Sequence, residues 1–364
     1  MIDVLVAGGG PVGLATAIRC ALAGLTVTVA EPRTAPVDKA CGEGVMPAAV
    51  RRLAALGVTP DGHPLRGIRY VDATHQADAR FTRGNGLGVR RTVLHAALSA
   101  RAAALGIPVL PARVTAFAQD AGHVTAAGVE ARYLVAADGL HSAIRRTLEQ
   151  GSLAAGVAGR SRSGRSRPGS RTLAPQRYGL RRHYRVVPWT DLVEVHWTPQ
   201  AEAYVTPVSP DVVGVALLFA KSGQDGAGGG FQARLPAFPA LLDRLAGAAP
   251  ASEVRGAGPM RQDVRRRVYG RVLLVGDASG YVDALTGEGL GVGLAQADAL
   301  AGCLAAGRPA DYERAWRRVS GPAWRFTAGL LWSRNQPLLG PRLVPFAQRL
   351  PWVFTTLVNH VAEA

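Results

Sequence analysis

The chain has 364 residues, of which 48% are hydrophobic and 19% charged, and it contains 44 glycines. This length suits two closely joined domains or one large α/β unit with an inserted subdomain. The composition excludes a mostly disordered chain, a coiled coil and a collagen-like fibre. No apolar run reaches the roughly 18–20 residues of a membrane span, and the N-terminus enters a strand pattern without the basic region of a secretory signal.

The formal net charge is +16, from 42 basic and 26 acidic residues. Nearly all of the positive charge is arginine, because lysine occurs only at Lys39 and Lys221. Most arginines are dispersed along the chain, so we do not expect a nucleic-acid partner. Attraction to an anionic cofactor or to a membrane surface agrees better with this charge.

The cysteines Cys20, Cys41 and Cys303 have neither a CxxC spacing nor a companion histidine cluster. The sequence therefore indicates neither a zinc site nor a disulfide framework, and we expect no bound metal. Cys20 and Cys303 fall in helical patterns and are expected in the core. A reduced, cytoplasmic protein is the corresponding expectation.

The first thirty residues form a strand, a glycine turn, a helix and a second strand. Residues 2–7 are a β-branched run, residues 11–22 have a helical pattern, and residues 25–30 form a strand that ends at Glu31. The same criteria predict helices over 47–56, 92–105, 231–246 and 287–306, hairpins over 66–90, buried strands over 133–137 and 271–275, and further strands over 178–220.

Two segments are predicted to be flexible, and the C-terminal tail is predicted to be helical. Residues 151–171 contain Gly, Ser, Ala and Arg without a period and are expected to form a linker, as is the patch over 223–230. Residues 310–364 are helical and rich in aromatic side chains. Packing of these side chains on the core is our first interpretation, with a cap over the active site or contact with a membrane interface as alternatives.

The first glycine motif predicts a dinucleotide site. Gly8-x-Gly10-x-x-Gly13 follows a strand and opens a helix. Gly8 permits the tight turn, Gly10 lets backbone amides approach a pyrophosphate, and Gly13 allows close packing of the helix on the sheet. Glu31 is placed to accept hydrogen bonds from ribose hydroxyls, with Arg33 beside it as a further cofactor contact. An acid at this position favours FAD or NAD(H) over NADPH.

Two further motifs distinguish between these cofactors. DGxxSxxR spans residues 138–145, and Gly276-Asp277 follows a second buried strand. With three motifs in this order, the sequence resembles the p-hydroxybenzoate hydroxylase-like flavoprotein superfamily, which includes aromatic monooxygenases, flavin halogenases and geranylgeranyl reductases. The resemblance covers roughly residues 2–56, 88–147 and 255–306.

The resemblance implies an α/β fold, with a Rossmann-type FAD-binding domain, an inserted β-rich substrate domain and a helical C-terminal tail. It places the discontinuous FAD-binding domain at residues 1–65, 88–160 and 255–308, the substrate domain at 66–87 and 171–254, and the helical segment at 309–364.

The resemblance also implies roles for individual residues. Asp277 would hydrogen-bond the ribityl chain of FAD, while Asp138 and Gly139 would lie near the pyrophosphate and are linked in the family to NAD(P)H use. Arg91 would touch FAD, and its guanidinium fork matches pyrophosphate oxygens. Because there is no second GxGxxG, we expect tightly bound FAD, with NAD(P)H as a transient reductant or a separate reductase in its place.

The flavin edge resembles the geranylgeranyl reductase branch more than the hydroxylases. Cys41-Gly42-Glu43-Gly44 is similar to a segment that lies beside the flavin in that branch, and Gly276-Asp277 continues to Gly287-Glu288-Gly289. Backbone N–H groups at Gly287 and Gly289 could face the flavin pyrimidine edge, where negative charge develops on reduction.

The substrate strand departs from the prenyl reductase pattern. Pro199 and Pro207 keep the separation of that motif, but Glu202, Tyr204 and Thr206 occupy its three aromatic positions. An isoprenoid chain gains about 0.8 kcal/mol of binding free energy for each CH₂ that it buries against apolar side chains. Polar side chains in this row would reduce that gain. We therefore expect a more polar and more compact substrate.

Candidate catalytic residues are Cys41, Glu43 and Tyr204, with His183 and His196 as weaker candidates. Our hypothesis is a flavin monooxygenase that uses NAD(P)H and O₂ on a mid-sized ring-bearing or secondary-metabolite substrate. The alternatives are a geranylgeranyl reductase-like ene reductase and a non-catalytic flavin-binding protein. Halogenation is disfavoured because the WxWxIP-type signature is absent. Either a monomer or a homodimer agrees with the sequence, and peripheral membrane contact stays open.

Overall fold

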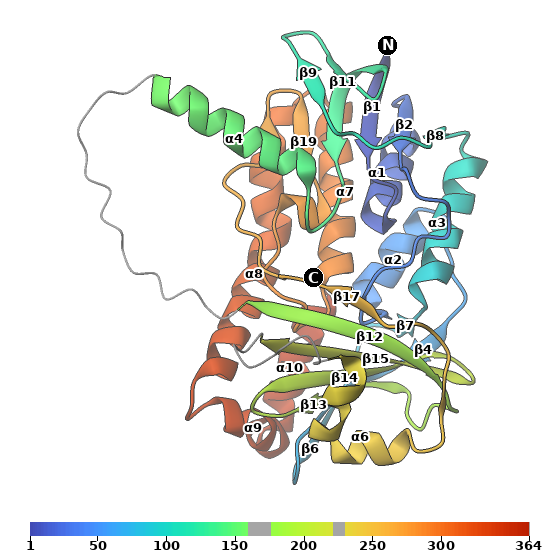
Figure 1. The fold of residues 1–364 in the computed structure, drawn as a ribbon, viewed down its shortest axis with the longest axis vertical. Coiled ribbons are helices and arrows are strands. Elements are labelled where there is room, and N and C mark those ends of the chain that lie inside the picture. The colour runs from blue at the N-terminus through green and yellow to red at the C-terminus, as the bar shows by residue number, and fades with distance from the viewer. Residues whose placement is uncertain (159–175, 221–229, 364) are drawn as a thin grey trace.

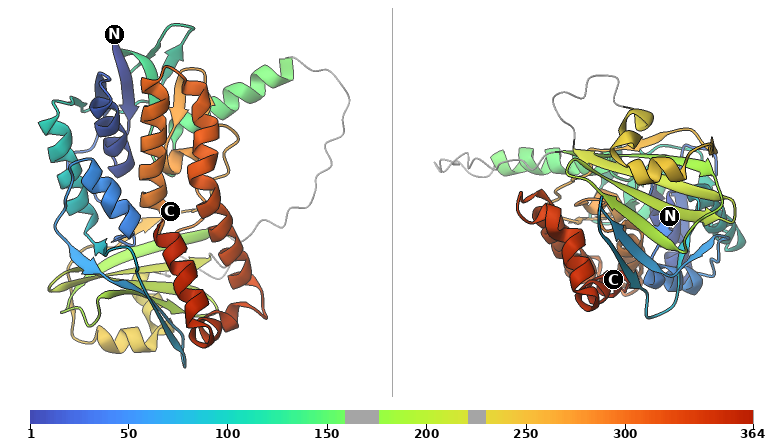
Figure 2. Two further views of the ribbon diagram at one scale, coloured as in Figure 1. Left: turned by 180° about the vertical axis from the view of Figure 1, so that it is seen from behind. Right: turned by 90° about the horizontal axis from the view of Figure 1, so that it is seen from below.

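The computed structural model describes residues 1–158, 176–220 and 230–363 (Figure 1). Two large sheets lie at opposite ends of the molecule, and the last helices run along both of them (Figure 2). The helices are α1 (Pro11–Leu22), α2 (Pro47–Ala55), α3 (Arg91–Ala104), α4 (Ala143–Ala158), α5 (Phe231–Arg234), α6 (Pro239–Arg244), α7 (Gly289–Ala305), α8 (Tyr312–Asn335), α9 (Leu343–Arg349) and α10 (Pro351–Ala362).

The first sheet is parallel at its centre. β1 (Ile2–Ala7) pairs in parallel with β2 (Val27–Ala30) and β11 (Val129–Ala136), and β11 pairs with β19 (Val272–Leu274). The main order is β18-β19-β11-β1-β2-β8, with β8 at Val109–Leu110 and β18 at Val268–Tyr269. In addition, β10 (Val124–Ala126) pairs with β11, and β9 (Phe117–Gln119) pairs with β10. Since β1, β11 and β19 are parallel, the motifs that follow them meet at one edge of the sheet.

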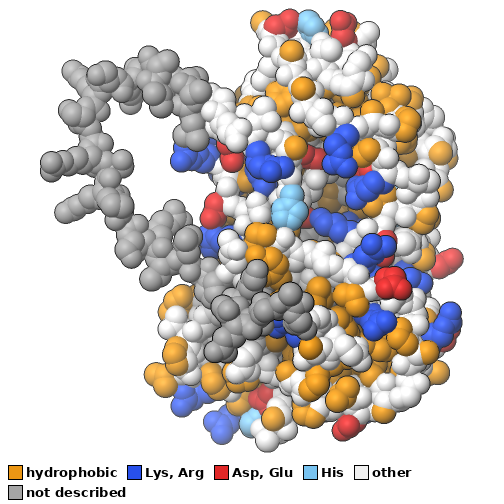
Figure 3. All heavy atoms as spheres, in the orientation of Figure 1, with side chains coloured by type: hydrophobic (Ala, Val, Ile, Leu, Met, Phe, Trp, Pro, Cys, Tyr) orange, Lys and Arg blue, Asp and Glu red, His pale blue; other side chains and the backbone are white. Residues whose placement is uncertain are grey.

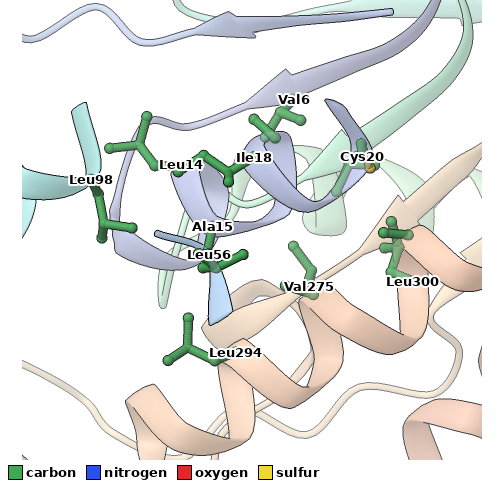
Figure 4. Close-up of a cluster of buried hydrophobic side chains, with 14 of the residues drawn as sticks. Val6, Leu14, Ala15, Ile18, Cys20, Leu56, Leu98, Val275, Leu294 and Leu300 are labelled. Carbon is green, nitrogen blue, oxygen red and sulfur yellow. The ribbon is translucent and has the colours of Figure 1, made fainter. Parts of the chain in front are cut away.

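Close helix packing covers this sheet (Figure 4). Leu14 and Ile18 of α1 pack with Val6 of β1 and Leu294 of α7 in one buried cluster. Gly13 makes this approach sterically feasible, because a Cβ there would lie 1.9 Å from the Gly8 carbonyl oxygen. The same cluster contains fully buried Cys20, as predicted, whereas Cys303 is partly exposed and packs at its border.

The second sheet is mostly antiparallel and has the order β16-β12-β15-β14-β13-β5-β6. Its strands are β5 (Gly67–Val71), β6 (Gln76–Arg80), β12 (Arg177–Arg185), β13 (Leu192–Trp197), β14 (Ala201–Ser209), β15 (Val212–Ala220) and β16 (Ala249–Pro250). Two strands differ from the expected domain boundaries. β7 (Gly86–Gly88) pairs with β3 (Gly44–Val45) and β4 (His63–Leu65) in a separate small sheet, and β17 (Arg255–Ala257) pairs with β12.

The C-terminal helices join the two sheets. α8 packs on α7, while α9 and α10 pack on β6. Phe354 and Val358 of α10 share a buried cluster with Ile68 of β5 and Val195 of β13. The predicted helical tail is confirmed, and it forms one wall of the space between the sheets. Among the described helices, none is both long enough and apolar enough to cross a bilayer.

One predicted loop boundary was wrong. Residues 151–158, expected to begin a linker, continue α4. Alanine and leucine in this stretch have high helix propensity, which extends the helix although the segment lacks a clear apolar period. The remainder of the predicted linker (159–171) and most of the second predicted flexible patch (223–229) lie outside the described residues.

Candidate flavin and substrate site

The glycine motif forms a cradle at the N-terminus of α1. Gly8 has φ 108°, and a Cβ there would lie 2.5 Å from the Ala137 carbonyl oxygen. A Cβ at Gly10 would meet nothing within 4 Å, because this residue faces open space. The backbone N–H groups at the start of α1 are therefore accessible to an anionic group, as a pyrophosphate requires.

Glu31 holds the glycine turn from behind and is 5% exposed. Its Oε2 accepts a hydrogen bond from the Gly9 N–H at 2.8 Å, and its Oε1 accepts one from the Arg33 Nε–H at 2.8 Å. Although burial opposes ionisation, hydrogen bonds from Arg33 and Gly9 lower the pKa of Glu31 overall. Glu31 is thus an ionised acceptor directly after β2, and its contacts hold Arg33 beside the glycine turn.

His95 on α3 is a further support that the sequence did not reveal. Its Nε2 lies 2.9 Å from the Gly9 carbonyl oxygen, and its Nδ1 lies 3.2 Å from the Ser99 hydroxyl. Burial lowers the pKa of His95. A neutral ring that donates from Nε2 to Gly9 satisfies both contacts, since a carbonyl oxygen can only accept.

Asp138 uses one carboxylate oxygen to begin α4. Its Oδ2 accepts a hydrogen bond from the Ala143 N–H at 2.9 Å. Its Oδ1 is buried and has no hydrogen-bond partner within the described part of the chain. A buried acceptor without a partner is costly, so this oxygen indicates a polar ligand such as a cofactor hydroxyl.

Arg145, the last residue of the DGxxSxxR motif, ties the second and third motifs together. Its guanidinium donates to the carbonyl oxygens of Leu140 at 2.9 Å, Ala278 at 3.2 Å and Asp277 at 3.3 Å. The Asp277 carboxylate itself contacts Lys39 Nζ at 3.3 Å and is partly exposed. Asp277 therefore lies at the open edge of the sheet, with its backbone held by a buried cation.

A cavity of about 460 Å³ joins the motif loops to the second sheet. Most predicted cofactor residues line it: Gly10, Gly13, Arg33, Arg91, Asp138, Gly139, Gly276, Asp277, Gly287 and Gly289. Gly8 and Glu31 support the turn behind this wall. The residues present fit an extended FAD. Along one cavity they provide glycines that leave room for the cofactor, accessible N–H groups at the start of α1, and two acidic acceptors, Asp138 and Asp277.

The substrate side of the cavity is more apolar than the sequence suggested. Glu202 is fully buried, and its carboxylate pairs with Arg177 Nη2 at 2.6 Å and with Arg334 of α8. The Thr206 hydroxyl donates to the Gly42 carbonyl oxygen at 2.8 Å. The polar groups of this row are therefore satisfied within the protein, and the expectation of a more polar substrate loses its basis. The remaining wall includes Ile68, Val193, Val195, Leu218, Met260 and Phe354.

The candidate catalytic residues Cys41, Glu43 and Tyr204 all line the cavity. Tyr204 donates its phenolic hydrogen to the Leu285 carbonyl oxygen at 2.6 Å, which anchors the segment before Gly287. Cys41 Sγ lies 3.4 Å from the Glu43 backbone nitrogen and is partly exposed.

Glu43 is held by contacts on both carboxylate oxygens. Its Oε1 accepts a hydrogen bond from the Arg91 N–H at 2.8 Å, and its Oε2 lies 2.5 Å from His183 Nε2. Arg181 Nη1 lies 3.1 Å from His183 Nδ1, so that nitrogen accepts and Nε2 donates to Glu43. Glu43 has φ 61°, a conformation uncommon outside glycine. These contacts hold the Cys41 loop against the start of α3.

His196 contacts Glu194 instead of the candidate catalytic residues. Its Nε2 lies 3.3 Å from Glu194 Oε2 in the second sheet. Glu194 also accepts a hydrogen bond from Trp189 Nε1 at 2.9 Å. Both contacts lie within β13 and the loop before it, and Arg69 of β5 joins them to the next strand through Glu194 Oε1 at 3.4 Å.

Glu288 is a second residue to which the sequence assigned no role. It precedes α7, is 6% exposed, and neither of its carboxylate oxygens has a hydrogen-bond partner in the described ranges. Burial raises the pKa of Glu288 to about 8. Its only signal in the sequence is an acid between two glycines at a helix start.

With this geometry, the comparisons with known proteins define the class. The chain matches the FAD binding domain family over residues 1–206 and belongs to it. It is therefore a member of the FAD-dependent oxidoreductase superfamily that includes flavin monooxygenases and halogenases, which confirms the resemblance inferred from the motifs.

Three curated relatives cover different shares of the chain. The dialkyldecalin synthase of Streptomyces rugosporus is 28% identical over 330 residues, or 83% of this chain, and the chain spans 65% of that protein. Digeranylgeranylglycerophospholipid reductase 1 of Methanopyrus kandleri is 27% identical over 317 residues, covering 80% of this chain and 77% of the relative. A 3-(3-hydroxy-phenyl)propionate/3-hydroxycinnamic acid hydroxylase of Mycobacterium avium is 32% identical over 177 residues, covering 40% and 30%.

Among solved structures, the flavin-dependent brominase Bmp2 superimposes with a TM-score of 0.76. The match covers 100% of this chain and 94% of the brominase at 16% identity. At this identity the similarity shows the fold, and it confirms the α/β architecture with a helical C-terminal segment.

Proposed function

We propose that this protein is a FAD-dependent monooxygenase that uses NAD(P)H and O₂ to oxygenate a mid-sized, ring-bearing metabolite with a largely apolar surface. One observation carries this proposal: a single cavity runs from the flavin motifs into an apolar wall built by the second sheet and the C-terminal helices. The hydroxylase relative supports oxygenation. The two relatives that match more of the chain are named for other reactions, one as a synthase and one as a reductase.

The cofactor residues suit distinct parts of FAD. Glu31 would hold the adenosine ribose, the Gly10 turn and Arg91 would hold the pyrophosphate, and Asp277 would hold the ribityl chain. The glycines around Glu288 would present N–H groups to the pyrimidine edge. When bound, FAD would supply two-electron redox chemistry and activation of O₂.

The chain's own contribution is to position the substrate and to exclude water. The overall reaction balances as substrate C–H, O₂, NAD(P)H and H⁺ giving C–OH, H₂O and NAD(P)⁺. An apolar wall beside the flavin edge keeps water from competing with the substrate. Tyr204 and Glu43 act as positioning residues in this proposal, because their polar atoms bind the backbone at Leu285 and Arg91.

Ene reduction is the second candidate, and the Cys41 thiol favours it. Cys41 lines the cavity on the flavin side. In this reaction a C=C bond gains a hydride, derived from NAD(P)H, on one carbon and a proton on the other, and a thiol could donate that proton. Polar side chains in the substrate strand would weaken the binding of an isoprenoid chain if they faced it. Glu202 and Thr206 instead bind other groups of the protein, so they do not exclude such a chain from this cavity.

The two reactions differ in the mass of the product. FAD-loaded protein would be mixed with NADH or NADPH and a panel of alkylated phenols and isoprenoid alcohols, under isotopically labelled O₂ and without O₂. We expect one labelled oxygen atom in the product and no turnover without O₂. Gain of two hydrogen atoms without O₂ would establish ene reduction instead. An isomer formed without NAD(P)H consumption would contradict both and support a ring-forming role similar to that named for the Streptomyces relative.

A further inference from the structure

The C-terminal helices expose large apolar side chains. Trp332 at the end of α8 is 60% exposed, Phe346 on α9 is 50% exposed, and Trp352 at the start of α10 is 70% exposed. Within the described residues, these are the three exposed aromatic side chains. Leu338 and Leu339 in the turn between α8 and α9 are exposed as well. This concentration at one end of the molecule is unusual for a surface facing only water.

Between Glu313 in the first turn of α8 and Glu363 after α10, every charged side chain is basic. From residue 314 to residue 362 the sequence contains seven arginines and no aspartate or glutamate. Arg342 directly precedes α9, Arg349 is its last residue, and both are exposed. Figure 3 shows basic and apolar side chains interspersed at the lower left, where α9 lies in Figure 1, with acidic and histidine side chains beside them. Aromatic side chains mixed with arginine on these helices match the headgroup region of an anionic bilayer.

The cavity opens toward this surface. Phe346 and Leu357 line the cavity and are also exposed, so they form part of its rim. Leu343 and Val361 continue the apolar lining inward from the same helices. The exposed apolar surface is therefore continuous with the substrate wall.

The surface is held in place by polar contacts to the second sheet. Arg334 of α8 pairs with buried Glu202 and donates to the Pro199 carbonyl oxygen at 3.0 Å. Asn359 of α10 accepts a hydrogen bond from the Thr82 N–H at 2.8 Å and donates to the Arg80 carbonyl oxygen at 2.9 Å. These contacts present the exposed side chains on a fixed support.

We propose that this surface binds the headgroup region of an anionic lipid bilayer and that the apolar substrate enters the cavity from the bilayer. The α8–α10 face, as we call it, consists of Trp332, Leu338, Leu339, Arg342, Phe346, Arg349, Trp352 and Leu357. The docking step is independent of the reaction, whereas the entry of substrate rests on the proposed function. Amphipathic tryptophan and arginine side chains favour lipid over a second copy of the chain or an acidic carrier protein.

The test is sedimentation of the FAD-loaded protein with lipid vesicles. We expect binding to phosphatidylcholine vesicles that contain a minority of phosphatidylglycerol, and weaker binding to pure phosphatidylcholine or at high salt. The double variants Trp332→Ser/Trp352→Ser and Arg342→Gln/Arg349→Gln should each bind about tenfold more weakly, from lost apolar burial and lost charge respectively.

Matched controls lie elsewhere on the surface. Val187 is 71% exposed between β12 and β13, and Arg185 is exposed beside it. Val187→Ser and Arg185→Gln should bind vesicles as the unchanged protein does. Flavin content and melting temperature of every variant verify that it is folded.

Several outcomes would overturn the proposal. They are the absence of binding to anionic vesicles, equal losses in the Val187 control, or a change of oligomeric state in the tryptophan variant without loss of vesicle binding. Capture of an acidic carrier protein without any lipid binding would also overturn it. Vesicle binding with no turnover on any substrate would support docking and contradict the proposed function, so the two failures are distinguishable.

Discussion

The two sides of the cavity are built by different means. On the flavin side, Gly10, Asp138 and Asp277 each follow a parallel strand, so the order of strands brings short local motifs to one edge. On the substrate side, the character of the wall depends on partners distant in sequence, because Glu202 is neutralised by Arg177 and Arg334. A local motif can be recognised from its residues alone, whereas a wall made by remote pairs requires the fold.

The glycine turn provides the largest expected effect on the flavin side. Gly13→Ala would place a Cβ 1.9 Å from the Gly8 carbonyl oxygen, so α1 must shift away from the sheet. We expect loss of about 3 kcal/mol or more of unfolding free energy, together with loss of bound flavin. Gly10→Ala is the matched control, because its Cβ enters open space. It should lose flavin but keep the melting temperature of the flavin-free protein. If both variants destabilise the flavin-free protein equally, Gly10 does not face open space as the structure indicates.

On the substrate side, Glu202→Gln would leave buried Arg177 without its closest carboxylate partner. Breaking a buried ion pair from one side costs about 3–5 kcal/mol, measured by chemical denaturation. Asp191→Asn removes partners from the more exposed Arg80 and Arg66, and should cost about 1 kcal/mol or less. If Glu202→Gln lowers the unfolding free energy no more than Asp191→Asn does, the ion pairs of Glu202 do not stabilise the substrate side of the cavity.

Glu288, at the junction of the two sides of the cavity, should make the unfolding free energy depend on pH. Its pKa is raised from 4.5 to about 8 in the folded protein, so the native state binds the extra proton between these values. The stability attributable to Glu288 is therefore greatest below about pH 4.5 and falls as the pH rises toward 8. Glu288→Gln should remove a slope of at most about 1.4 kcal/mol per pH unit.

Exposed Glu130→Gln is the control for this measurement, made by denaturation across the pH range. Parallel curves for Glu288→Gln and the unchanged protein would show that Glu288 is ionised and solvated in the native state.

Cys41→Ala has the smallest expected effect if the protein is a monooxygenase, and it distinguishes oxygenation from ene reduction. Under oxygenation the thiol has no required proton to donate, so the rate of substrate oxygenation should stay nearly unchanged. Under ene reduction, loss of a general acid lowers kcat by about 10²–10⁴-fold. Steady-state rates with NAD(P)H and the identified substrate separate these outcomes, with Cys303→Ala as the control outside the cavity wall.

Much of the flavin side could be predicted from sequence because spacing and strand order carry the information. The sequence placed the glycine turn, Glu31 and Asp277 at the ends of strands, and the structure puts them around one cavity or directly behind it. His95 escaped prediction because a single histidine in a helix has no motif. Arg145 was part of a recognised motif, but only the fold shows that it joins two motif loops.

The substrate side was only partly predictable. Glu202 was correctly singled out as unusual, but its partners lie 25 and 132 residues away. The α4 extension to Ala158 and the pairing of β17 with β12 also lay beyond local patterns. Helix ends and strand partners are decided by packing as well as by propensity.

By itself, the sequence determined the parallel core of the FAD-binding domain, the positions of its three motifs and the helical tail, because each depends on residues within one turn, one strand or one helix. Only the tertiary structure decided the polarity of the substrate wall, the isolation of Glu288 and the exposure of the α8–α10 face. The reason is physical: whether a charge is paired, or an aromatic ring is covered, depends on which distant segment packs against it.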